Sequence, residues 1–212
     1  SDEAAATRLG RLEIDIAVDL AGYTTDSRTG IFAARAAPVQ VNYLGFPGTM
    51  GAPFIDYILA DRLVIPDTHE PFYAEKVVRL PDTFQCSPPR PVANATPARR
   101  EAGLPENGFV FCCFNNTRKI NPKLFDIWMR LLKQVEGSVL WLSKANQQAA
   151  GNLRRETQGR GVDPDRLVFA SPVAGLDEHL ARQRLADLFL DTLPYNAHTT
   201  AVDALWVGLP VL

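Results

Sequence analysis

The sequence predicts an α/β fold with a doubly wound parallel sheet, and three observations support this. Short apolar runs alternate with segments of helical spacing along residues 107–212. The clearest run, residues 109–114, is apolar throughout, as expected for a parallel strand buried on both faces. A weakly patterned, proline-rich stretch separates this alternation from earlier strands. We therefore expect two domains, residues 1–80 and 107–212, joined by a linker over residues 81–106.

The first domain is expected to contain four strands and one short helix. The first strand is expected at residues 14–20, which are rich in isoleucine and valine and are followed closely by Gly22. A short helix is expected at residues 27–34. The other strands are predicted at residues 39–44, 54–59 and 75–81. The second strand leads into a glycine- and proline-containing loop, "GFPGTMGAP".

The second domain shows a regular strand–helix order. Asn121 and Pro122 fit a helix N-cap followed by proline at the first helical position. The remaining elements are listed in order along the chain: strands at 109–114, 139–142, 167–170 and 188–190; helices from 122 to 132, over 147–160 and 177–184, and from about 200 to 207. Residues 210–212 resemble the start of another strand, so we expect the chain to be a fragment of a longer protein.

Composition excludes several classes of partner. The net charge is −2 and the pI is about 5.9, so no basic surface for nucleic acid is expected. No apolar run approaches the roughly 20 residues that span a bilayer, and the polar start does not resemble a signal peptide. The spacing of Cys86, Cys112 and Cys113 does not fit a metal site. We expect a cytoplasmic protein with reduced thiols, in which Cys112 and Cys113 face opposite sides of a strand.

Polar residues follow three of the predicted strands, where ligands bind in doubly wound sheets. These loops are residues 115–121, 171–179 and 191–200. A helix that begins at Thr199 or Thr200 offers unpaired N–H groups to a phosphate. Thr200 and Asp203 also fit a capping box, so this feature alone leaves both interpretations open.

Other candidate positions also allow two readings. Lys119 suits a phosphate contact or a solvated side chain, and His179 suits a ligand contact or a plain surface histidine. The loop from Gly45 to Gly51 allows close backbone approach or an ordinary turn. Together these positions favour a nucleotide or nucleotide-sugar site.

Several long stretches resemble the catalytic region of O-GlcNAc transferases and their bacterial relatives. They are "GYTTDSRTGIFAARAAPVQVNYLGFPGTMGAPFIDYILAD", "FNNTRKINP", "SVLWL", "RLVFASPV" and "LFLDTLPYNAHTTAVDALWVGLPVL". The resemblance implies a GT-B fold: the end of a first Rossmann-like domain and most of a second, with the donor bound between them. It also implies metal-independent, inverting transfer of N-acetylglucosamine from UDP-GlcNAc to Ser or Thr hydroxyls of proteins, with no cofactor.

The resemblance also assigns roles to matched residues. Lys119 corresponds to the lysine that contacts the pyrophosphate and stabilises the leaving group. The matched phosphate-binding positions are His198, Thr199 and Thr200, and Asp203 matches the carboxylate that binds the ribose hydroxyls. The remaining matches are Ala174 and His179 around the uracil, Arg182 in the same stretch, Asn116 near the sugar, and Leu44, Gly45 and Pro47 in the loop that faces the sugar from the first domain.

Two positions depart from the pattern of the animal enzymes. Asn116 stands where they have a glutamine near the sugar, and Leu176 stands where they have a lysine at the ribose. These departures bear on donor affinity and on the identity of the sugar. Residues 81–106 replace a long insertion of the animal enzymes, which indicates a bacterial-type homologue.

Parts of the family pattern are missing from this chain. They include the tetratricopeptide repeats that bind protein acceptors, and the first half of the N-terminal catalytic domain. No residue fits a general base, so we expect the isolated chain to bind weakly and turn over little. The alternatives are a protein O-fucosyltransferase that uses GDP-fucose, a non-catalytic nucleotide-sugar-binding module, and a hydrolysing or epimerising GT-B enzyme. The run "NYLGFPGTMGAPFIDYI" favours the protein transferase.

Overall fold

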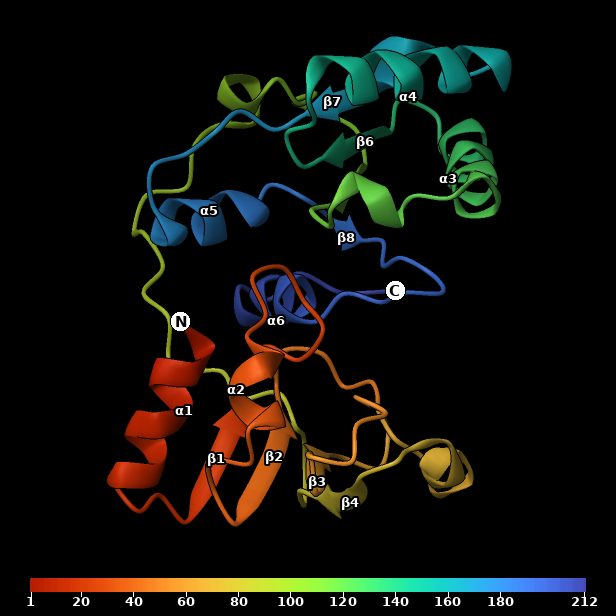
Figure 1. The fold of residues 1–212 in the computed structure, drawn as a ribbon. Helices are drawn as coiled ribbons and strands as arrows, with labels where there is room; N and C mark the ends of the chain where they lie inside the picture. Colours follow the sequence, from red (N-terminus) through yellow and green to blue (C-terminus); the bar gives the residue numbers. More distant parts are fainter. The chain divides into compact units, whose positions relative to one another are not determined.

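The computed structural model describes residues 1–212, which divide into two compact units, Ser1–Ser87 and Pro88–Leu212. Each unit contains a four-stranded sheet in which all paired strands run parallel (Figure 1). The predicted α/β class with parallel sheets is therefore confirmed. None of the helices has the length and apolar character needed to cross a membrane.

The first unit has its strands in sequential order, β1-β2-β3-β4. Its elements are α1 (Asp2–Arg11), β1 (Ile16–Asp19), α2 (Thr29–Ala33), β2 (Val39–Tyr43), β3 (Tyr57–Ala60), a 3₁₀ helix η1 (Asp67–Phe72) and β4 (Lys76–Arg79). The expected strands and short helix are present. Strand β3 begins three residues later than predicted, because the Ile55 amide closes a turn on the Ala52 carbonyl (3.1 Å). Phe54 and Ile55 pack into the core from that turn rather than from a strand.

Helix α1 was not among the predicted elements. Its sequence is polar, but both ends carry helix signals. The Ser1 hydroxyl accepts a hydrogen bond from the Ala4 amide, Asp2 and Glu3 occupy the first turn, and Arg8 and Arg11 occupy the last. Only Ala6 is buried. The helix therefore depends on its termini and charges more than on an apolar stripe.

The second unit has the strand order β7-β6-β5-β8. Its strands are β5 (Val110–Cys113), β6 (Val139–Leu142), β7 (Leu167–Phe169) and β8 (Leu188–Phe189); its α-helices are α3 (Pro122–Gln134), α4 (Gln147–Gly159), α5 (Leu176–Gln183) and α6 (Thr199–Trp206). The chain adds strands outward on one side of β5 and then crosses to the other side with β8. This is the doubly wound arrangement that the sequence predicts, with a switch point between β5 and β8.

Strand β5 is buried along its whole length and separates two apolar clusters. Cys112 packs with Trp141 and Phe189, while Cys113 packs on the other face with Trp128 and Leu140. The prediction that the two thiols face opposite sides is therefore confirmed. Helix α3 begins as expected, because Asn121 Oδ1 accepts from the Leu124 amide (3.0 Å) and Pro122 is the first helical residue.

Residues 88–106, which we expected to be part of a linker, pack against the second unit. They include two further ordered features, the 3₁₀ helix η2 (Arg99–Ala102) and a hydrogen bond from the Ala93 amide to the Asp177 carbonyl (3.2 Å). The Arg99 guanidinium donates to the Gly108 carbonyl (2.8 Å) and to Asp187 (2.9 Å). The composition indicates a connecting segment here, but the Arg99 guanidinium binds it to residues that precede strands β5 and β8.

Candidate functional site

The loops after β5 and β8 meet at the switch point of the second sheet, and Asn115 joins them. Its side-chain amide donates to Asp191 Oδ1 (3.2 Å) and Thr192 Oγ1 (3.1 Å). Its Oδ1 accepts from Thr200 Oγ1 (2.7 Å) and from Lys119 Nζ (3.4 Å). Asn115 is only 2% exposed. One buried asparagine thus ties the β5 loop, the β8 loop and the first turn of α6 together.

The β8–α6 loop is held in shape by its own carboxylate. Asp191 Oδ1 accepts from the amides of Thr192 and Ala197, each at 2.7 Å, and Oδ2 accepts from Asn196 Nδ2 (3.0 Å). Asn121 Nδ2 also donates to the Leu193 carbonyl (2.6 Å). The loop that precedes α6 is therefore preorganised by fixed hydrogen bonds.

Lys119 lies at the end of the 3₁₀ helix η3 (Thr117–Lys119) and points to this loop. Its Nζ donates to the Asn196 carbonyl (2.8 Å) and lies 4.4 Å from the centre of the Tyr195 ring. Burial lowers the pKa of the Lys119 ammonium, and the nearby Asp191 carboxylate partly opposes that shift. A partly buried cation therefore stands beside the start of α6.

The capping-box interpretation of α6 is wrong. His198 is the N-cap residue, and no side chain makes a capping hydrogen bond there. Thr200 instead donates to Asn115, and Asp203 forms a buried ion pair with Arg90. The first turn of α6 therefore keeps amide groups free of side-chain caps, which favours an anion at this position.

His198 is held as a neutral ring beside Lys119. Its imidazole stacks on Tyr195, with ring centres 5.8 Å apart and planes inclined by 20°. Burial and the Lys119 charge lower the pKa of His198, against a smaller opposing effect of Asp191.

A second group of candidates lies on α5 and in the loop that precedes it. Arg182 Nη2 lies 2.8 Å from His179 Nδ1, and Arg182 Nη1 donates to the Ser171 carbonyl (2.5 Å). Burial and the adjacent guanidinium lower the pKa of His179 to about 4. His179 is thus neutral at pH 7 and uses Nδ1 as an acceptor, with its ring edge-on to Phe114 (5.4 Å between centres).

The other matched positions of this region are more exposed. The Ala174 amide donates to Glu178 Oε2 (3.1 Å), which orders the turn before α5. Leu176 is 50% exposed. A cavity of about 650 Å³ lies beside this group, lined by Trp141, Ser171, Val173, Glu178 and Arg182 and by residues 95–98, 101 and 102.

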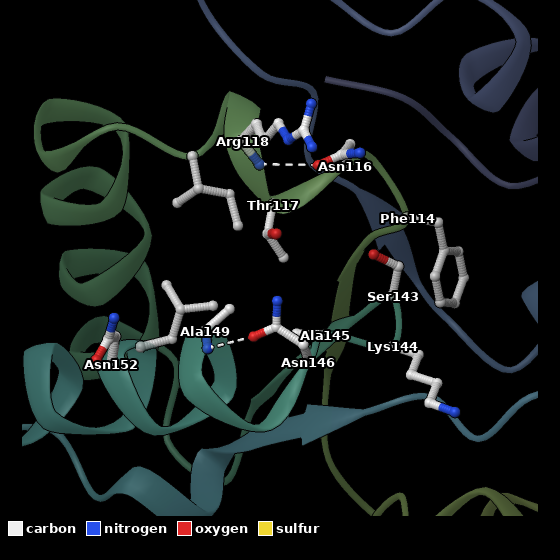
Figure 2. A pocket seen from close by; sticks show the side chains of 12 residues that line it. Phe114, Asn116, Thr117, Arg118, Ser143, Lys144, Ala145, Asn146, Ala149 and Asn152 are labelled. Carbon is white, nitrogen blue, oxygen red and sulfur yellow. Dashed lines mark hydrogen bonds between the residues drawn. The ribbon is translucent and has the colours of Figure 1, made fainter.

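A larger cavity, of about 830 Å³, lies between η3, the loop after β6 and helix α4 (Figure 2). In Figure 2 the side chains of Thr117 and Asn146 approach it from opposite sides, while Lys144 points away from it. Asn116 also lines this cavity, and its Oδ1 accepts from the Arg118 amide (3.0 Å). Lys119 does not line it, so Asn116 and Lys119 face different spaces although they are three residues apart.

The matched loop of the first unit packs closely against the backbone that follows β1. Leu44 has a φ of +75°, and a Cβ on Gly45 would lie 2.4 Å from the Leu20 carbonyl oxygen. The Pro47 carbonyl accepts from the Tyr73 hydroxyl (2.9 Å). Only glycine fits at position 45, because the loop crosses the backbone that follows β1.

Sequence reasoning missed Asn115, Arg90 and Tyr195. The signal for Asn115 was its place directly after a buried strand, but the neighbouring Asn116 offered the same chemistry. Arg90 lies in the proline-rich stretch and is 113 residues from Asp203, so no local pattern connects the two. Nowhere in residues 1–212 are three or more His, Cys, Asp or Glu side chains arranged to hold a metal ion.

Comparison with known families finds a match over the whole chain. Residues 1–92 and 87–212 match the model described as Glycosyl transferase family 41. The chain is 40% identical over 220 residues to the probable UDP-N-acetylglucosamine–peptide N-acetylglucosaminyltransferase SEC of Arabidopsis thaliana. That alignment covers 100% of this chain and 22% of the plant protein. A Caenorhabditis elegans protein named UDP-N-acetylglucosamine–peptide N-acetylglucosaminyltransferase is 27% identical, covering 98% of this chain and 28% of the relative.

Solved structures agree with this match. A mutant O-GlcNAc transferase of Thermobaculum terrenum superposes with a TM-score of 0.89 at 34% identity, covering 100% of this chain and 40% of that one. Anabaena HepE, solved in complex with UDP and glucose, matches with a TM-score of 0.63 at 14% identity. The superposition covers 99% of this chain and 61% of the HepE chain. At this sequence identity the similarity concerns the fold alone. The chain thus spans about a fifth of the curated plant relative and less than half of the T. terrenum structure.

Proposed function

The chain belongs to glycosyl transferase family 41, and on that premise we propose that it forms part of a protein O-GlcNAc transferase. The complete enzyme would transfer N-acetylglucosamine from UDP-GlcNAc to Ser or Thr hydroxyls of proteins. Transfer would invert the anomeric centre and need no metal. The acceptor protein would bind through tetratricopeptide repeats outside this chain.

One observation carries the proposal: Asn115 holds Lys119 and the first turn of α6 together at the switch point of the second sheet. When UDP leaves, negative charge develops on its β-phosphate. An ammonium and helix-terminal amides fixed beside that phosphate stabilise the charge without reorganising during the reaction. In this role Lys119 stabilises the leaving group, while His198, Thr199 and Thr200 line the phosphates.

The rest of the donor would follow the same edge of the sheet. Asp203 would accept hydrogen bonds from the ribose hydroxyls. The neutral ring of His179, with Ala174 and Arg182, would face the uracil. Asn116 would contact the sugar, and Leu44, Gly45 and Pro47 would contact it from the first unit. The general base would come from outside this chain.

The experiment is calorimetric titration of UDP, UDP-GlcNAc and GDP into the full-length protein, followed by a transfer assay. We expect selective binding of the uridine nucleotides. Replacing Lys119 by alanine should weaken UDP binding at least tenfold, since a hydrogen bond to a charged group contributes about 1.5–3 kcal/mol. The matched control is Lys133→Ala, which removes an exposed lysine on α3.

Each other outcome points to a different alternative. Selective binding of GDP would replace the proposal by a protein O-fucosyltransferase. Uridine-nucleotide binding without transfer to any protein would leave a non-catalytic module, and release of free or isomerised sugar would indicate a hydrolase or epimerase. If no nucleotide binds, the proposed site is wrong.

A further inference from the structure

Arg90 contacts helix α6 at two points. Its guanidinium donates to Asp203 Oδ1, and its backbone carbonyl accepts from Trp206 Nε1 (3.2 Å). Asp203 and Trp206 are three residues apart on α6, so they lie on the same side of the helix. Pro89 and Pro91 flank Arg90 and restrict its backbone. The proline-rich stretch therefore presents one arginine to α6 in a fixed orientation.

The ion pair between Arg90 and Asp203 is buried. The two side chains are 13% and 7% exposed, whereas those of the surface pair Arg62–Asp67 are 73% and 67% exposed. Burial of a lone carboxylate is costly, and an uncompensated one takes up a proton rather than remain charged. The Arg90 guanidinium supplies the counter-charge that Asp203 needs on this helix.

We propose that Arg90 is a positioning residue for the donor nucleotide, because it orients the Asp203 carboxylate and supplies its counter-charge, so that Asp203 accepts hydrogen bonds from the ribose hydroxyls. The inference rests on the proposed function. The guanidinium engages Oδ1, and each carboxylate oxygen has further lone pairs, so acceptor capacity remains for two hydroxyls. Arg90 itself makes no contact with the nucleotide in this scheme.

Two other roles of Arg90 predict different changes in nucleotide affinity. If Arg90 occupied the place of the ribose, it would compete with the nucleotide for Asp203, and removing it would tighten binding. If the ion pair only stabilised the fold, its loss would weaken all nucleotides equally. The response to the ribose hydroxyls therefore separates these roles.

The test is calorimetry of UDP and 2′-deoxy-UDP with the full-length protein, comparing wild type, Arg90→Ala, Arg90→Lys, Asp203→Ala and the double alanine variant. Arg100→Ala is the matched control, since Arg100 is an exposed arginine of the same stretch. We expect Arg90→Ala to weaken UDP about tenfold and to reduce the preference for UDP over 2′-deoxy-UDP. The double variant should bind no more weakly than Asp203→Ala, and Arg90→Lys should recover part of the affinity.

Four results would overturn the inference. They are tighter UDP binding by Arg90→Ala, an unchanged preference for UDP over 2′-deoxy-UDP, additive losses in the double variant, and an unchanged affinity. Thermal melting of each variant identifies unfolded protein, and in that case Arg90→Lys gives the deciding ratio. Absence of UDP binding by the wild type would instead reject the proposed function, and the role of Arg90 with it.

Discussion

The carboxyl ends of the two sheets use their polar side chains differently. In the first sheet Asp19 accepts from the amides of Ala21 and Gly22, and the Asn42 side chain donates to the Phe46 and Gly48 carbonyls. These groups stabilise their own loops. In the second sheet Asn115 links two loops and a helix, and a partly buried lysine and two neutral histidines lie nearby.

Topology explains the difference. The strands β1 to β4 follow one another in order, so successive loops at that edge run side by side. In the second sheet the chain crosses from one side of β5 to the other, so the loops after β5 and β8 meet at the switch point, where doubly wound sheets bind ligands. Asn115 joins these two loops and the first turn of α6. The strand order therefore accounts for the long-range side-chain contacts at this edge of the second sheet.

The largest predicted effect tests the closed loop of the first sheet. Replacing Gly45 by alanine places a methyl group 2.4–2.5 Å from two carbonyl oxygens, so the backbone must move. We expect a loss of about 3 kcal/mol in the free energy of unfolding, at the upper end of overpacking effects. Urea titration followed by circular dichroism measures it.

The control for Gly45 is Gly10→Ala in α1, where an added Cβ meets nothing within 4 Å. That change should stabilise the helix by up to about 1 kcal/mol. Equal behaviour of the two variants would mean that the loop yields easily, and the contrast between the two sheet edges would then weaken.

A smaller effect is expected at the crossing residue of the second sheet. Asn115→Ala removes the partner of the Thr200 hydroxyl and one of the two partners of Thr192 and of Lys119, so we expect a loss of about 2 kcal/mol. Tryptophan fluorescence follows this unit specifically, because all three tryptophans lie within residues 88–212. The exposed neighbour provides the control: Asn116→Ala should cost less than about 1 kcal/mol. A larger loss for Asn116 than for Asn115 would contradict the central place given to Asn115.

The smallest effect concerns the pH dependence of the second unit. Its cause is that the folded protein holds the pKa of His179 at about 4, against an ordinary value of 6.5. Between these values the unfolded chain binds a proton that the folded one does not. The contribution of His179 to the free energy of unfolding therefore falls as pH drops from 6.5 to 4, and this contribution changes no further below pH 4.

The variant His179→Gln should remove this pH dependence. We expect it to amount to about 1–2 kcal/mol in the free energy of unfolding between pH 6.5 and 4, after discounting for partial exposure. Unfolding by urea at pH 7, 5.5 and 4.5 measures it, with the exposed His69→Gln as control. Parallel pH curves for wild type and His179→Gln would show that His179 is not buried as a neutral ring.

The sequence predicts the strands and most helices because their signals are local. Residues 109–114 are apolar throughout, and Asn121 precedes Pro122 at a helix start; both patterns hold in the structure. The two failures at α6 have one physical reason. Thr200 and Asp203 fit a local cap, but their actual partners are 85 and 113 residues away, at Asn115 and Arg90.

The sequence predicts which loops form the candidate site, but it does not predict the hydrogen bonds that join those loops. The three loops were identified from strand ends, and Lys119, His198 and His179 lie in them. The choice between Asn115 and Asn116 depends on which side chain turns inward at the end of β5, and no composition or spacing rule decides that. Long-range hydrogen bonds settle it, and they appear only once the sheet is assembled.

Strand β5 also carries a pair of chemical reporters. Burial raises the pKa of Cys112, and it raises that of Cys113 to about 11, so neither thiol is a reactive thiolate at neutral pH. Because the two thiols lie in different apolar clusters, each becomes accessible to an alkylating reagent only when its own face of the sheet opens. In variants that lack the exposed Cys86 and retain one of the two strand cysteines, the alkylation rate would measure how often that face of the strand opens. The two rates would compare the layer of α3 and α4 with the layer of α5 and α6.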